Sequence, residues 1–172
     1  DAISREVFDR EPPLNVVYEF LNVGGRKMST SKGSGAAAHE MADLIPPELI
    51  RFLFLRPKPK KALEFDPGGD AIPGLFDEFD RLAAAVAGRP VRGELPADFE
   101  RIFRLSLVDA EADPAAEAAR FRPAFRHLTM LVQVPGVDLV ARMNEEKGEP
   151  LDEIELAILE ERAGVARTWL DG

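Results

Sequence analysis

Residues 26–35 read Arg-Lys-Met-Ser-Thr-Ser-Lys-Gly-Ser-Gly and are the most informative stretch of the chain. Lysines, hydroxyl side chains and glycines together can hold a phosphate chain, because they supply positive charge, hydrogen-bond donors and a closely approaching backbone. Composition alone favours a mobile solvated loop. The order Lys-Met-Ser-x-Ser-Lys-Gly is more specific than composition. It is not a Walker A loop, because no Gly-Lys-Ser or Gly-Lys-Thr follows a glycine at the required spacing.

The flanking segments predict a strand before this stretch and helices after it. Residues 15–23 are rich in β-branched and aromatic side chains and end at Gly24-Gly25, which predicts a strand. Residues 36–44 predict a short helix, and Pro46-Pro47 opens a strongly apolar one that runs to Leu55. Residues 57–61, Pro-Lys-Pro-Lys-Lys, break that helix.

Residues 27–31, Lys-Met-Ser-Thr-Ser, resemble the second signature of class I aminoacyl-tRNA synthetases, usually written KMSKS. With its flanks, the chain resembles class I lysyl-tRNA synthetase, the type found in archaea and some bacteria. The resemblance spans about residues 10–170 and is strongest over 16–66. Thr30 stands where the general signature has lysine, and the lysyl branch commonly has a small hydroxyl residue there.

The resemblance implies a lysine–tRNA ligase. Lysine and ATP, with Mg²⁺ accompanying the ATP, would form lysyl-adenylate, and lysine would then pass to the terminal ribose of tRNA(Lys). The implied catalytic residues are Lys27, Ser29 and Ser31. The implied ATP-binding residues are Lys27, Met28, Ser29, Thr30, Ser31, Lys32 and Gly33. We expect no metal ion held by the protein itself, because the chain has no Glu-x-x-His pattern of the kind used by di-iron bundles.

One half of the expected ATP site is missing from the sequence. Class I synthetases carry an earlier HIGH motif, and neither His39 nor His127 lies in a His-x-Gly-His setting. The chain begins at Asp1 without an initiator methionine or a signal segment. We therefore expect a piece of a longer protein that is inactive without the N-terminal catalytic half of the same polypeptide.

Composition and charge narrow the possible classes. The 172 residues contain no cysteine, which excludes disulfides and thiolate zinc sites and is compatible with the cytoplasm. No apolar run approaches a membrane span. The net charge is −9, yet residues 1–61 hold ten Lys/Arg and eight Asp/Glu. The densest basic cluster, a candidate for phosphate contacts or a solvated loop, is Arg51, Arg56, Lys58, Lys60 and Lys61.

Helical periodicity dominates from Ile72 onward, where apolar side chains recur at three- and four-residue spacings. Expected helices cover 72–87, 99–108, 115–121, 125–132, 137–143 and 151–170. The predicted fold class is mainly α: a helical bundle of the anticodon-binding type, preceded by a small α+β remnant of a Rossmann-like catalytic domain. The predicted division is 1–35 (end of the catalytic domain), 36–66 (stem-contact and connecting region) and 67–172 (helical bundle).

Other side chains receive structural interpretations. On the last helix, the acidic residues predict a solvated face, and Asp152 is a candidate helix cap. Ile154 and Trp169 are expected to lie in the core. For Arg120, Arg122 and Arg126, pairing with nearby carboxylates is favoured over gripping RNA phosphates.

Two other functions remain open. The chain could be a noncatalytic helical tRNA- or protein-binding module, with residues 26–35 a flexible loop. It could also belong to another class I synthetase such as the glutamyl type, whose loop usually has leucine after the first lysine, where this chain has Met28. An open, unfinished sheet edge beside the loop would favour a severed catalytic domain over a freestanding module.

Overall fold

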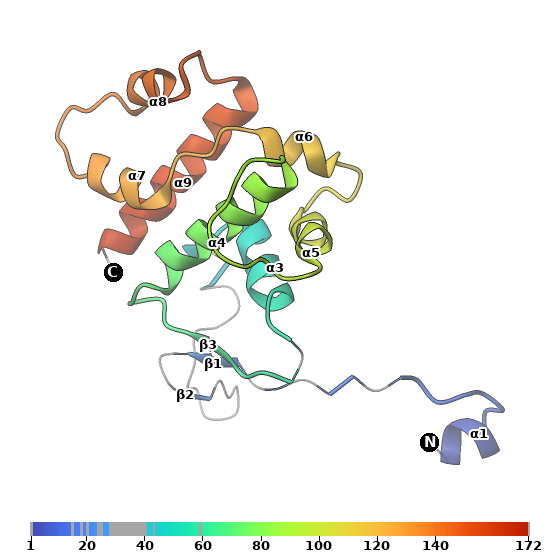
Figure 1. Ribbon diagram of the computed structural model, residues 1–172. Coiled ribbons are helices and arrows are strands. Elements are labelled where there is room, and N and C mark those ends of the chain that lie inside the picture. Colours follow the sequence, from blue (N-terminus) through green and yellow to red (C-terminus); the bar gives the residue numbers. More distant parts are fainter. Residues whose placement is uncertain are drawn as a thin grey trace.

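The structure is a computed structural model that describes residues 2–14, 16–17, 19, 21–23, 26–27, 41–42, 44–58 and 60–171. Helices dominate these residues, and a short sheet lies below the bundle formed by the helices from Pro47 onward (α3 to α9) in Figure 1. The predicted fold class, mainly helical with a small α+β part, is confirmed. Within the described ranges, no helix combines the length and the apolar character needed to cross a membrane.

The sheet has three short strands in the order β2-β1-β3: β1 (Leu21–Val23), β2 (Arg26–Lys27) and β3 (Leu63–Phe65). β1 pairs antiparallel with β2 and parallel with β3. The strand predicted over 15–23 is therefore too long. Val16 and Val17 are exposed and lie outside any strand, because β-branched residues form a strand only where a partner strand is present.

α3 (Pro47–Leu55) begins where the sequence predicts. Pro46 is its N-cap residue and Pro47 occupies the first turn, where a missing N–H costs nothing. Leu49, Phe52 and Leu53 form its buried face, which packs against α4 and α5. Of the preceding helix predicted over 36–44, Met41, Ala42 and Leu44 are helical, and the other positions lie outside the described residues.

α4 (Ala71–Val86) buries the predicted apolar stripe, which includes Leu75, Phe76, Phe79 and Leu82. Gly88 follows its C-terminus with a φ of +72°. The Gly88 N–H donates to the Ala85 carbonyl, and the Arg89 N–H donates to the Ala84 carbonyl at 2.8 Å. This is a Schellman motif, which requires a left-handed residue at the position of Gly88.

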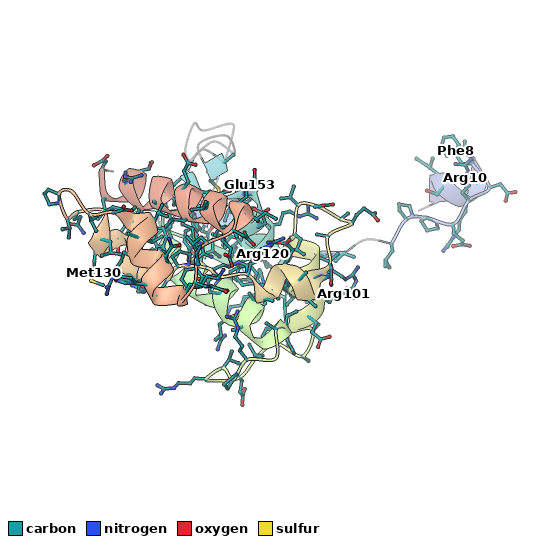
Figure 2. All side chains as sticks on the ribbon, turned by 90° about the horizontal axis from the view of Figure 1, so that it is seen from above. Phe8, Arg10, Arg101, Arg120, Met130 and Glu153 are labelled. Carbon is teal, nitrogen blue, oxygen red and sulfur yellow. The ribbon has the colours of Figure 1, made fainter. Side chains whose placement is uncertain are left out.

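The remaining helices, apart from α1, lie close to the predicted ranges. They are α1 (Ala2–Glu6), α5 (Phe99–Ser106), α6 (Pro114–Ala119), α7 (Phe125–Leu131), α8 (Leu139–Lys147) and α9 (Glu153–Asp171). α7 packs against α9, and α4 contacts α5, α6 and α7, so α4 is the central helix of the bundle. α1 lies apart from the bundle in both views, with Phe8 and Arg10 labelled beside it in Figure 2.

A chain of aromatic contacts connects the helices through the core. The Phe79 ring lies 5.5 Å from Phe52 and 5.4 Å from Phe103, centroid to centroid. Phe76 stacks on Phe125 at 4.1 Å, and Trp169 meets the edge of Phe125 at 6.3 Å, so the predicted core role of Trp169 is confirmed. Core residues come from both sides of the 66–70 turn. The three-part division of the chain stays a prediction.

A capping box starts α9. The Glu155 N–H donates to the Asp152 carboxylate at 2.8 Å, and the Asp152 N–H donates to the Glu155 carboxylate at 3.0 Å. The predicted cap at Asp152 is confirmed. Two other expectations for this helix are wrong: Ile154 is 48 % exposed, and Glu155 is buried rather than solvated. The capping box turns the Glu155 side of the helix inward, and Ile154, one residue earlier, then points away.

Lys147 and the backbone hold Glu155 in its ionised form. Its carboxylate accepts hydrogen bonds from the Lys147 ammonium at 2.5 Å and from the Phe121 N–H at 3.0 Å. Burial alone would raise the pKa of Glu155, but these bonds and the Asp152 N–H outweigh burial and lower the pKa to about 2. The contribution of Glu155 to stability is therefore complete above its ordinary pKa of 4.5 and is lost as the pH falls towards 2.

We expect Glu155→Gln to lower the free energy of unfolding by about 2 kcal/mol at neutral pH, because it removes charge-assisted hydrogen bonds from a buried group. The difference from the wild-type chain should shrink as the pH falls through 4.5 towards 2. Urea unfolding at a series of pH values measures it. Glu153→Gln, an exposed change in the same helical turn, is the matched control. A pH-independent difference would contradict the assigned role of Glu155.

Candidate functional site

The sheet positions the start of the predicted phosphate loop. Lys27 is the last residue of β2 and lies opposite Asn22 on β1, which in turn lies opposite Glu64 on β3. Neighbouring strands are about 4.8 Å apart, so the backbones of Lys27 and Glu64 are about 10 Å apart. The Asn22 side-chain amide also donates to the Glu64 carboxylate. The loop therefore starts two strands away from Glu64.

The predicted site residues fall mostly outside the described residues. These are Met28, Ser29, Thr30, Ser31, Lys32 and Gly33. The structure describes the backbone of Lys27 as part of β2 but not its side chain. The ATP-binding roles of all seven residues stay predictions.

A cleft of about 630 Å³ lies beside β3. Its walls come from the end of α3, the segment 57–64, α4 and residues 96–102. Basic residues outnumber acidic ones in these walls: Arg56, Lys58, Lys61 and Arg81 against Glu64 and Glu78. Both Leu63 and Glu64 of β3 line the cleft, so the sheet that carries Lys27 also forms one side of it.

Hydrogen bonds leave part of the positive charge in the cleft uncompensated. Arg56 forms an ion pair with Glu78, and Glu64 accepts a hydrogen bond from Asn22, whose neutral amide leaves the charge of Glu64 in place. Arg81 instead donates to the carbonyl oxygens of Arg92 and Glu94, at 3.3 and 3.4 Å. Carbonyl acceptors carry no net charge, so the charge of Arg81 remains. Lys58 and Lys61 are exposed at the same cleft, and neither forms an ion pair within the described part of the chain.

A glycine allows the 92–94 loop to approach Arg81. Gly93 has a φ of +78°, and a Cβ atom there would lie 3.1 Å from Nη1 of Arg81. A side chain at this position would be strained and would displace the guanidinium. The contribution of Arg81 to the cleft could not be read from the sequence, because Arg81 lies 20 residues beyond the basic cluster and joins it only through the packing of α4.

The basic cluster predicted from the sequence is divided by the structure. Arg56, Lys58 and Lys61 line the large cleft. Arg51 lines a separate depression with Ile50, Phe54, Leu55 and Leu105, and Lys60 lines neither. Three of the five basic residues are therefore brought together.

The prediction that three arginines pair with carboxylates is right for two of them. Arg120 lies 2.9 Å from Glu117 and 3.6 Å from Asp152. Arg126 binds Asp70 and Asp77, each at 2.7 Å, and Asp70 raises the pKa of the Arg126 guanidinium. Arg122 instead donates to backbone carbonyls.

The remaining titratable groups among the described residues form no further candidate centre. His127 lies 3.1 Å from Glu146 at the surface, and His39 lies outside the described residues. In the part of the chain that the structure describes, no three His, Asp or Glu side chains gather into a group that could hold a metal ion.

Comparison with known proteins gives consistent matches. The family described as tRNA synthetases class I (K) matches residues 1–109. The lysine–tRNA ligase of Archaeoglobus fulgidus is 33% identical over 172 residues, which are 98% of this chain and 31% of that protein. That of Thermoplasma acidophilum is 35% identical over 170 residues, 98% of this chain and 32% of that protein. Lysine–tRNA ligase 1 of Methanosarcina acetivorans is 42% identical over 115 residues, 65% of this chain and 21% of that protein. The chain spans about a third of the length of the first two relatives.

Proposed function

Because the chain belongs to the class I (K) tRNA synthetases, we propose that it is part of a lysine–tRNA ligase of the cytoplasm. The whole enzyme would activate lysine with ATP and transfer it to tRNA(Lys). The printed names of the relatives support lysine as the amino acid. In this proposal the full-length polypeptide has the length of the relatives and contains these 172 residues. Its other residues would supply the lysine pocket and the second half of the ATP site.

In the proposed reaction, a carboxylate oxygen of lysine attacks the α-phosphorus of ATP, and pyrophosphate leaves with its electron pair. Mg²⁺ would arrive with the ATP. A ribose hydroxyl of the tRNA then attacks the carbonyl carbon of lysyl-adenylate, and AMP leaves. The negative charge that develops on the departing pyrophosphate is the group that a lysine-bearing loop can stabilise.

We assign the loop residues to this step. Lys27 offsets charge on the leaving pyrophosphate, Ser29 and Ser31 hold phosphate oxygens or order the loop, and Met28 packs inward and anchors it. Thr30 and Lys32 contribute a further hydroxyl and charge, and Gly33 permits closure. The observation that carries this assignment is the position of Lys27, at the end of a strand two strands away from a basic cleft.

The sheet favours part of a catalytic domain over a freestanding module. Its strands are two or three residues long, and β3 pairs on only one side among the described residues. Parallel strands are usually covered on both faces, and a sheet of such short strands depends on packing against neighbouring elements for its stability. The N-terminal segment exposes Ile3, Val7, Phe8 and Leu14, between 65% and 90% each. Both features support the proposal that the N-terminal half of the full-length polypeptide covers this region, with residues 1–35 completing its catalytic domain.

The cleft is the best described candidate for a tRNA contact. Lys58, Lys61 and Arg81 outnumber Glu64, the one carboxylate of the cleft without a cationic partner among the described residues, and the remaining net positive charge suits a phosphodiester backbone. In this proposal residues 36–66 connect the catalytic and anticodon-binding domains, and residues 67–172 form part of the latter. The overall charge of −9 does not oppose this contact, because salt screens distant charges beyond about 8–10 Å.

Exchange of radiolabelled pyrophosphate into ATP tests the proposal. We expect the full-length polypeptide to catalyse exchange only when lysine is present, and the 172-residue chain alone to catalyse none, because it contains one half of the ATP site. Exchange that depends on glutamate would establish the glutamyl alternative. No exchange with any amino acid, from a folded full-length polypeptide, would favour the noncatalytic module. Exchange by the chain alone would contradict the proposed division of the ATP site.

A further inference from the structure

Three arginines surround Asp80 near the centre of α4. They are Arg89, just after α4; Arg122, just before α7; and Arg162, on α9. Arg162 binds the Asp80 carboxylate with two hydrogen bonds, at 2.7 and 2.5 Å, and is only 4 % exposed. The negative charge of Asp80 and the positive charge of Arg162 therefore cancel, which leaves the positive charges of Arg89 and Arg122.

Neither of the remaining two guanidinium groups is balanced by a carboxylate among the described residues. Arg122 donates to the carbonyls of Glu117 and Arg120, at 2.7 and 3.3 Å, and Arg89 donates to the carbonyl of Ala118 at 3.1 Å. The carboxylate of Glu117 is occupied by Arg120. Burial, followed by the repulsion of Arg162, lowers the pKa of Arg122 to about 10, so Arg122 is still charged at neutral pH.

A cavity of about 290 Å³ lies against these two guanidinium groups. It is lined by Asp80, Ala83, Ala84, Arg89, Pro90, Phe121 and Arg122. This volume corresponds to on the order of ten water molecules, which is enough for a small oxyanion with part of its hydration shell. The cavity is open to solvent on the side of Arg89 and Pro90, and its aliphatic and aromatic walls exclude water on the other sides, which strengthens electrostatic attraction there relative to a flat surface.

Free carbonyl groups at the C-terminal end of a helix carry partial negative charge, which repels an anion. At the C-terminal end of α4, which lies beside this cavity, that repulsion is reduced. The carbonyls of Ala83, Ala84 and Ala85 accept hydrogen bonds from the N–H groups of the following residues in the helix cap. The remaining carboxylate in the wall, Asp80, is bound by Arg162. Among the described side chains that line this cavity, the two without a carboxylate partner are thus both positive. Glu117 and Glu161, the other carboxylates nearby, line a neighbouring depression instead.

We propose that this cavity binds a phosphate group between Arg89 and Arg122. The guanidinium fork matches the oxygens of a phosphate, and two such groups from different segments can bind it on two sides. A bound anion also compensates the partly buried charge of Arg122. The phosphate could be inorganic phosphate or a phosphodiester of a bound RNA, and the chemistry of recognition is the same for both.

Calorimetric titration with inorganic phosphate tests the site, with chloride used to hold the ionic strength constant. We expect the 172-residue chain to bind phosphate with a Kd on the order of 1 mM. Arg122→Gln should weaken binding at least about tenfold, the equivalent of one charge-assisted contact. Arg89→Gln, a change at the exposed end of the cavity, gives a second reading should Arg122→Gln disturb folding, and should weaken binding about threefold or more. Arg101→Gln, an exposed change on α5 outside the cavity, is the matched control and should leave binding unchanged (Figure 2).

Binding to tRNA at several salt concentrations identifies the source of the phosphate. If the site holds an RNA phosphodiester, Arg122→Gln should reduce the slope of log affinity against log salt by about 0.7–0.9, and inorganic phosphate should compete with the RNA. If the site takes free phosphate only, Arg122→Gln should leave RNA binding unchanged. This second measurement rests on the proposed function, and the double variant Lys58→Gln/Lys61→Gln tests the cleft separately.

The site would be refuted if the wild-type chain and the Arg89 and Arg122 variants bound both inorganic phosphate and RNA equally well, or if the wild-type chain bound neither. A different result would separate the two proposals. If the Lys58/Lys61 variant lost RNA binding while Arg122→Gln affected neither ligand, this site would be refuted and the proposed tRNA contact at the cleft would stand.

Discussion

Replacing Lys27 by alanine in the full-length polypeptide is expected to slow formation of lysyl-adenylate by about 10²–10³-fold, the loss typical of removing one group that stabilises transition-state charge. The proposed role of Lys27 is to offset charge that develops on pyrophosphate as it departs. This charge is greater in the transition state than in bound ATP, so the loss should fall on kcat rather than on binding. The KM for lysine should change by no more than about twofold.

Steady-state pyrophosphate exchange, supported by single-turnover adenylate formation, measures this effect. Lys27→Arg keeps the positive charge and should recover part of the rate. Lys60→Ala removes an exposed lysine that lines neither described cleft and should leave the rate unchanged. A loss of lysine affinity with an unchanged activation rate would contradict the role given to Lys27.

The largest expected effect on stability comes from Asp80→Ala. This substitution leaves the buried guanidinium of Arg162 without its carboxylate, beside Arg122, which is itself uncompensated within the described structure. Breaking a buried ion pair by removing one partner costs about 3–5 kcal/mol, because the remaining charge stays out of water. For a chain of this size the Tm should fall by roughly 6–20 °C.

Two variants separate this explanation from a general effect of changing α4. Asp77→Ala removes an exposed carboxylate one turn earlier, where Arg126 keeps Asp70 as a partner, and should cost less than about 1 kcal/mol. Asp80→Ala combined with Arg162→Met should recover part of the loss, because no uncompensated charge is then buried at this position. Urea and thermal unfolding measure all three. Equal destabilisation by Asp80→Ala and Asp77→Ala would mean that the Arg162 pair does not stabilise the chain as described.

Local chemistry explains why much of the fold could be predicted. Pro46-Pro47 before an apolar run, the stripe from Leu75 to Leu82 and the glycine at position 88 each act through bonds and contacts within a few residues. The predicted helices therefore agree closely with the observed ones. The strand over 15–23 was predicted too long, since a strand depends on partners elsewhere in the chain and only Leu21–Val23 has them in the described part.

The candidate site could be predicted only in part. The order Lys-Met-Ser-x-Ser-Lys-Gly identifies the loop, but most of its residues lie outside the described structure. Arg81 was missed because it reaches the cleft through the packing of α4, and the burial of Glu155 was missed because polar residues on a helix normally face water.

The order of neighbouring side chains is enough to give the family resemblance, the run of helices and their approximate extents. Which charges are balanced depends on the folded chain. The tertiary structure pairs Arg162 with Asp80 across 82 positions, places Lys147 against Glu155, and leaves Arg122 with carbonyl acceptors. The physical reason is that an ion pair depends on distance in space and on exclusion of water, and neither is encoded in the separation of two residues along the chain.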